Sequence, residues 1–130
     1  MAEQLPVATL LAATLAGLLI RLSLGVIALR RRHRVSVGTG GEPRLDRAMR
    51  AQANLIEYGP LAVILTALAE WQGAPLWLLA PTALVFALGR AAHAYSFTRE
   101  REEFHFRVAG MHMTIWPLMG LIVMAVLSLA

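Results

Sequence analysis

The most informative stretch of the chain reads Arg47-Ala48-Met49-Arg50-Ala51-Gln52-Ala53-Asn54-Leu55-Ile56-Glu57-Tyr58-Gly59-Pro60. It enters an apolar segment, although polar side chains in hydrocarbon are costly unless they find partners. Its polar stripe consists of residues at helical positions i, i+4, i+7 and i+8, which share one face: Arg50, Asn54, Glu57 and Tyr58. We expect this stripe to form one wall of a binding site.

The composition indicates an all-α integral membrane protein. Of the 130 residues, 58% are hydrophobic and only 15% are charged, whereas soluble domains are roughly 45–50% apolar. Cysteine is absent, which excludes disulfides, thiolate metal sites and a protein thiol nucleophile, so any sulfur chemistry must come from a ligand. Every one of the 12 basic residues is arginine, whose planar fork suits carboxylate and phosphate.

The hydrophobic pattern predicts a single domain, residues 1–130, with four transmembrane helices. A span needs about 20 apolar residues, and such stretches occupy about 5–29, 47–69, 76–94 and 106–129. The first stretch is interpreted as a retained helix because its positive charges, 30–34, follow it, whereas those of a cleavable signal peptide precede its apolar core.

Several local features refine this pattern. Pro43 and Asp46 favour the first turn of the helix that carries the polar stripe. Residues 71–75 predict a tight turn, and the charged residues 98–103 predict a short solvated connector. Gly110 and Gly120 are available for close packing between helices.

The distribution of arginine predicts the orientation in the membrane. Apart from Arg21, the arginines lie in 30–50 and 90–107. By the positive-inside rule, the connectors 30–50 and 95–106 are expected in the cytoplasm and both termini on the opposite side. Because four short spans enclose little space, we also expect a symmetric oligomer with sites between subunits.

The stretch from Arg50 to Leu61, preceded by Arg47, closely resembles the second-helix signature of the MAPEG family, the membrane-associated proteins in eicosanoid and glutathione metabolism. This is the family of microsomal glutathione transferases and leukotriene C4 synthase. The resemblance extends over nearly the whole chain, through Arg30-Arg31 with Arg34-Val35-Ser36, then Gly89-Arg90-Ala91-Ala92-His93, and finally Arg107.

The resemblance implies a homotrimer of four-helix subunits that binds glutathione as a co-substrate between neighbours, near the cytosolic face. The residues carried over as glutathione contacts are Arg30, Arg50, Gln52, Asn54, Glu57, Tyr58, Arg90 and His93. Arg107 matches the catalytic arginine held to stabilise the glutathione thiolate. The other partners implied are membrane lipid and a lipophilic small-molecule substrate, an electrophile or hydroperoxide. Some members place a tyrosine four residues after the helix-three histidine, where this chain has Phe97.

The same chemistry can be argued from the residues. A tripeptide with two carboxylates, an ammonium and a thiol requires arginine forks, a carboxylate for the amine and a cation beside the sulfur; Arg50, Glu57 and Arg107 supply these types. A free thiol has a pKa of about 8.5, and a neighbouring guanidinium in a water-poor site lowers that pKa.

Structural explanations compete with each functional one. Arg50 could reach to the interface, Asn54 could join helices, and Glu57 could neutralise Arg21 within a subunit or across subunits. A lone histidine at a helix end, such as His93, is often just a hydrogen-bonded interface residue. No metal site is expected, because the His105 and His112 pair lacks a carboxylate pattern, and no nucleic-acid partner is expected.

Three functions remain open. The first is a glutathione-dependent transferase or peroxidase acting on lipophilic substrates. The second is a catalytically inactive family member that serves as a membrane interaction or scaffold protein, and Phe97 favours this alternative. The third, a small cation exporter, is disfavoured because the first helix carries Arg21 and no carboxylate within the membrane.

Overall fold

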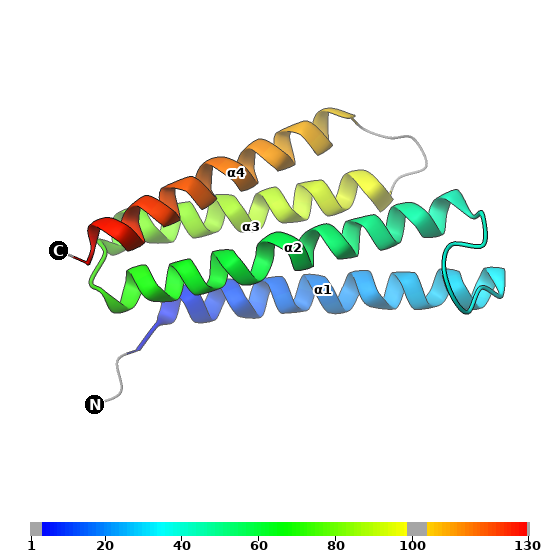
Figure 1. Cartoon of the computed structure of the whole chain (residues 1–130), viewed down its shortest axis with the longest axis horizontal. Coiled ribbons are helices and arrows are strands. Elements are labelled where there is room, and N and C mark those ends of the chain that lie inside the picture. The colour runs from blue at the N-terminus through cyan, green and yellow to red at the C-terminus, as the bar shows by residue number, and fades with distance from the viewer. Residues whose placement is uncertain (1–3, 99–103, 130) are drawn as a thin grey trace.

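The computed structural model describes residues 4–98 and 104–129. Its four α-helices are α1 (Pro6–His33), α2 (Pro43–Trp71), α3 (Leu76–Thr98) and α4 (Phe104–Leu127). They lie side by side and alternate in direction, so that α1 begins and α4 ends at the same end of the bundle (Figure 1). The expectation of an all-α fold is confirmed, whereas residues 99–103 of the expected charged connector lie outside the described residues.

Three of the helices are long and apolar enough to cross a membrane: α1, α3 over Leu76–Phe97, and α4. Their large apolar side chains are often exposed, as at Leu24, Leu84 and Val126, and such surface suits lipid rather than water. The chain is therefore a membrane protein. The polar stripe dilutes the hydrophobicity of α2, which is not among the three, so the expected span over 47–69 stays a prediction.

The tightest packing joins α3 to α4 at two glycines. A Cβ atom added at Gly89 would lie 2.7 Å from the backbone oxygen of Met113, and one added at Gly110 would lie 2.8 Å from the backbone nitrogen of His93. Both distances are too short for a side chain, so glycine allows this close approach. The expectation for Gly110 is confirmed, whereas Gly120 has only an ordinary contact of 3.6 Å.

A carboxylate links the end of α2 to the start of α1. The two oxygens of Glu70 accept hydrogen bonds from the backbone N–H groups of Val7 and Ala8, each at 2.9 Å. Pro6 precedes them at the first helical position and has no N–H to satisfy. Glu70 therefore caps α1 in place of a local capping side chain.

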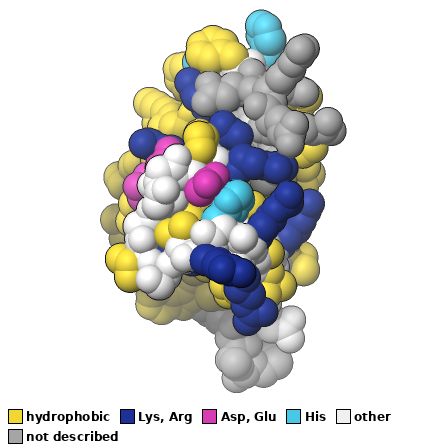
Figure 2. All heavy atoms as spheres, turned by 90° about the vertical axis from the view of Figure 1, so that its right-hand side faces the viewer, with side chains coloured by type: hydrophobic (Ala, Val, Ile, Leu, Met, Phe, Trp, Pro, Cys, Tyr) yellow, Lys and Arg dark blue, Asp and Glu magenta, His cyan; other side chains and the backbone are white. Residues whose placement is uncertain are grey.

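The α1–α2 connector is held by side chains from both of its ends. The Arg30 guanidinium donates to the backbone oxygens of Ser36 (3.4 Å) and Gly38 (3.0 Å), and His33 lies 3.4 Å from Glu42. Pro43 opens α2 and Asp46 falls in its first turn, as the sequence predicts. At this end of the bundle arginine side chains cover much of the surface (Figure 2).

Candidate functional site

A buried arginine on α3 joins half of the polar stripe to the bundle. Arg90 is 2% exposed, and its guanidinium donates to the side-chain oxygen of Asn54 and, at 3.3 Å, to the Asn54 backbone oxygen. Its Cζ lies 5.5 Å from the centre of the Tyr58 ring, and Nη2 lies 3.9 Å from the Met111 sulfur. The contact with Met111 has no signal in the sequence, because it depends on how α3 and α4 align.

The other half of the polar stripe is open to the surroundings. Glu57 is exposed, although it lies within electrostatic range of Arg90. Arg50 is also exposed and donates from Nε to Asp46 Oδ2 at 2.8 Å. Sequence reasoning missed Asp46 as a partner, although the i, i+4 spacing is a sufficient signal. The stripe therefore has an inner part that binds α3 and an outer part that a ligand can reach.

His93 and Arg107 extend this group toward the arginine-rich end. His93 is buried one turn after Arg90 and lies within electrostatic range of both Arg90 and Arg107. The Phe97 ring contacts both His93 and Arg107: its centre lies 5.1 Å from the centre of the His93 ring and 5.9 Å from the Cζ of Arg107. Arg107 also lies 5.5 Å from the Phe104 ring. One chain thus brings together seven of the nine expected site residues: Arg50, Asn54, Glu57, Tyr58, Arg90, His93 and Arg107.

The remaining two expected residues make contacts elsewhere. Gln52 points about 200° around α2 from Arg50, and its Nε2 donates to Ser23 Oγ on α1 at 2.8 Å. Arg30 binds the carbonyls of the connector and the Met49 sulfur, at 3.4 Å. Within a single chain, therefore, neither the Arg30 guanidinium nor the Gln52 amide contacts Arg90. Ser23 was missed, although a polar residue within an apolar run is a usable signal.

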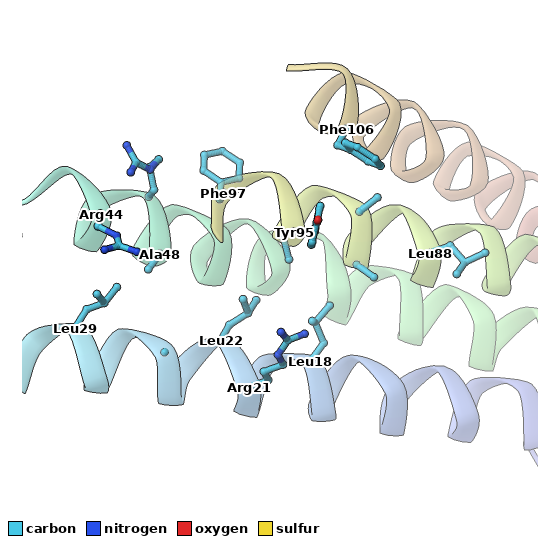
Figure 3. Close-up of a pocket in the computed structure, with 15 residues that line it drawn as sticks. Leu18, Arg21, Leu22, Leu29, Arg44, Ala48, Leu88, Tyr95, Phe97 and Phe106 are labelled. Carbon is cyan, nitrogen blue, oxygen red and sulfur yellow. The ribbon is translucent and has the colours of Figure 1, made fainter. Parts of the chain in front are cut away.

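A cavity of about 620 Å³ is bordered chiefly by α1 and α3, and Phe97 separates it from His93 and Arg107 by contacting both residues as well as the cavity (Figure 3). We call it the α1–α3 groove. Its walls include Arg21, and within the described chain no ion pair joins Arg21 to Glu57. No group of three or more histidine, aspartate or glutamate side chains in residues 4–98 and 104–129 could hold a metal ion.

Known proteins match this chain over residues from all four helices. A sequence model described as the MAPEG family matches residues 8–127. Inner membrane protein YecN of Escherichia coli strain K12 is 36% identical over 119 residues, which cover 92% of this chain and 88% of that protein. Inner membrane protein YecN of Escherichia coli O6:H1 strain CFT073 matches with the same identity and coverage.

Proposed function

Since the chain belongs to the MAPEG family, we propose that it is a glutathione-dependent transferase or peroxidase acting on lipophilic electrophiles or hydroperoxides. The observation that carries the proposal is the polar group around Arg90, set among apolar helices. Polar side chains in such a setting are costly and usually functional. Here Asn54 and Tyr58 hold Arg90 from α2, which leaves the outer residues of the stripe for a ligand.

The outer residues match the groups of glutathione. Arg50 can pair with a carboxylate and Glu57 with the ammonium group, because both side chains are exposed on the same face of α2. Arg107 comes from α4 and supplies the cation that favours the thiolate. The thiolate then attacks an electrophilic carbon delivered by the bilayer, and a thioether forms as the leaving group departs with the electron pair of its bond. With a hydroperoxide the thiolate attacks one oxygen, the O–O bond breaks to release the alcohol, and a second glutathione converts the resulting sulfenic acid into glutathione disulfide and water.

The positions of Gln52 and Arg30 support a homotrimer. Both are expected to contact glutathione, yet Gln52 faces α1 and Arg30 faces the connector. A neighbouring copy can present these residues to the polar stripe when the site lies between subunits. In this assembly α2 also crosses the membrane, in addition to α1, α3 and α4. Both connectors lie in the cytoplasm and both termini lie on the opposite side. The membrane is an inner membrane, like that of the YecN relatives.

Titration of the purified protein with glutathione tests the binding step. Replacing Arg50 by Ala removes a charge-assisted contact and should weaken binding by about 1.5–3 kcal/mol. Arg32→Ala removes the same charge from an exposed position at the end of α1 and serves as the control. An unchanged dissociation constant in Arg50→Ala would remove this residue from the site.

The ionisation of the bound thiol tests the role of Arg107. In Arg107→Ala the pKa of bound glutathione, followed by thiolate absorbance, should rise toward its free value of about 8.5 while the affinity changes little. S-methylglutathione provides the spectroscopic blank. If the pKa does not move, another group stabilises the thiolate.

The contacts of Phe97 favour a second function, in which the protein is catalytically inactive and serves as a membrane scaffold. The apolar ring of Phe97 contacts both His93 and Arg107, at the position where some family members carry a phenol. Turnover of glutathione with a chloronitrobenzene or with cumene hydroperoxide separates the two functions. Glutathione binding without turnover, together with turnover gained in Phe97→Tyr, would support the scaffold.

A further inference from the structure

The α1–α3 groove has the shape and lining of a site for an amphiphile. Its inner walls are apolar, with Leu18 and Leu22 on α1 and Leu88 on α3. Toward the arginine-rich end it is bordered by Arg44 on α2, and Figure 3 shows Leu29 of α1 across from Arg44, with Leu22 and Arg21 further along α1. An occupant would therefore meet charge at the mouth and mostly hydrocarbon further in, where Arg21 is the charged side chain among the described lining residues.

The charges that the described residues bring to the groove all have the same sign. Its charged members among the described residues are Arg21, Arg44 and Arg47, and none of the described lining residues is acidic. The Nε of Arg47 is buried and has no hydrogen-bond acceptor in the described part of the chain. A buried donor without an acceptor is destabilising, so a movement of the Arg47 side chain that brings its guanidinium to an anionic oxygen in the groove would be favourable.

The depth of Arg21 points to the same conclusion. Arg21 precedes the end of α1 at His33 by more than three turns, about 18 Å at 1.5 Å per residue. A charge at such a depth in a membrane is expected to mark a ligand or a partner. Its long side chain can extend along the groove toward the arginine-rich end, where Arg47 lies in the second turn of α2.

We propose that the α1–α3 groove binds an anionic phospholipid from the leaflet next to the arginine-rich end. The phosphate accepts hydrogen bonds from Arg47 at the mouth, beside Arg44, and one acyl chain lies along Leu22, Leu18 and Leu88. Arg21 reaches the glycerol ester oxygens below the phosphate. Basic pockets between membrane helices bind anionic head groups in this way. This lipid site lies within one subunit, and it borders the proposed glutathione site at Phe97, whose ring also contacts His93 and Arg107.

Native mass spectrometry of the delipidated protein tests the charge selectivity. Dioleoyl phosphatidylglycerol should bind at least about tenfold more tightly than dioleoyl phosphatidylcholine, and Arg47→Gln should weaken phosphatidylglycerol binding by about tenfold. Arg32→Gln, an exposed arginine at the same end but outside the groove, should leave it unchanged. Equal affinity for the two lipids, or equal losses in the two variants, would overturn the proposal.

Two glycines of α1 test the location without disturbing the helix packing. A Cβ added at Gly25, which lines the groove, or at Gly17, which does not, meets no atom within 4 Å. Gly25→Leu should therefore fill the groove and abolish tight phosphatidylglycerol binding, whereas Gly17→Leu should retain it. Binding retained in Gly25→Leu would overturn the proposal. So would a changed number of chains per particle in Gly25→Leu alone, since a second copy would then cover the groove.

Discussion

The guanidinium of Arg90 depends on oxygens from another helix. Within the described residues it receives both of its oxygen acceptors from Asn54, while its Nε has none. The Tyr58 ring lies against the same group and adds a cation–π contact. A buried cation whose acceptors are removed is strongly destabilising, so Asn54 stabilises the bundle whether or not it also contacts a ligand.

Replacing Asn54 by Leu tests this dependence. The variant loses the side-chain acceptor of Arg90 and should lower the free energy of unfolding by about 1–3 kcal/mol, the cost of leaving a buried polar group without a partner. The measurement is the thermal unfolding midpoint in detergent. Arg50→Gln, at an exposed position on the same helix, should stay within about 0.5 kcal/mol; equal losses in the two variants would contradict the assignment.

For individual residues, the sequence predicted which side chains form the polar stripe, but not which of them contact α3 and which stay exposed. The spacing in α2 places Asn54 and Tyr58 on the face of Arg50 and Glu57, because helical periodicity is local. Which members turn inward depends on Arg90, which is 36 residues beyond Asn54. That pairing is set by the alignment of two helices, and no local pattern encodes it.

Among the elements, α3 and α4 form the most closely fitted pair. Gly110→Ala adds a methyl group that meets the backbone of His93 and Gly89, at 2.8 Å and 2.9 Å. The backbone cannot yield easily, so α4 must move away, at a cost of about 1–3 kcal/mol, and Arg107 should shift from His93. We expect a lower thermal midpoint and, because Arg107 moves away from the thiol, a higher pKa of bound glutathione.

The matched control is Gly120→Ala on the same helix. Its added Cβ lies 3.6 Å from Thr82 Cγ2, an ordinary van der Waals contact. It should leave the midpoint unchanged or raise it slightly, because alanine favours the helix. A Gly110→Ala protein as stable as Gly120→Ala would show that the helix crossing can relax.

Glu70 ties two elements that are distant in sequence. Glu70→Ala removes both hydrogen bonds to the first turn of α1 and the favourable charge at its N-terminus. We expect a loss of about 2 kcal/mol in unfolding free energy, and faster hydrogen exchange at Val7 and Ala8. Glu70→Gln retains one acceptor and should lose less; unaltered exchange in Glu70→Ala would contradict the cap.

The sequence located the elements better than their connections. It predicted the start of α2 from Pro43 and Asp46, because helix termini have local chemistry. The role of Arg30 in the connector was not predictable. Its guanidinium reaches the carbonyl groups six and eight residues further along the chain because Arg34 adopts a left-handed backbone conformation, with φ of 57°. Non-glycine residues rarely adopt this conformation.

For the whole molecule, the arginine-rich end predicts which side faces the cytoplasm. Because the chain has no cysteine, single cysteines can be placed without other changes at Val37 (85% exposed) and Leu129 (72% exposed), which lie at opposite ends. In intact spheroplasts an impermeant maleimide should label Leu129→Cys and leave Val37→Cys unlabelled. Permeabilised cells, in which both should react, provide the control, and the reverse pattern would invert the orientation.

The sequence also predicted the class of the molecule, since its apolar composition and its family signature extend over nearly the whole chain. It could not locate the α1–α3 groove, whose walls come from residues as distant as Leu18 and Phe106. It likewise did not separate Gln52 from the rest of the site, because Gln52 meets Ser23 across the α1–α2 contact. Cavities and inter-helix bonds arise from the assembled bundle rather than from any one segment.

The two hydrogen bonds of Glu70 join residues that are made at different times during synthesis of the chain. Val7 and Ala8 leave the ribosome before the carboxylate that accepts their N–H groups, which is made 63 and 62 residues later. Until then the leading turn of α1 has donors without their partner, and the first hairpin is incomplete. We therefore expect α1 to remain loosely held at the insertion machinery until the last turn of α2 emerges, so that the two helices enter the bilayer as a pair.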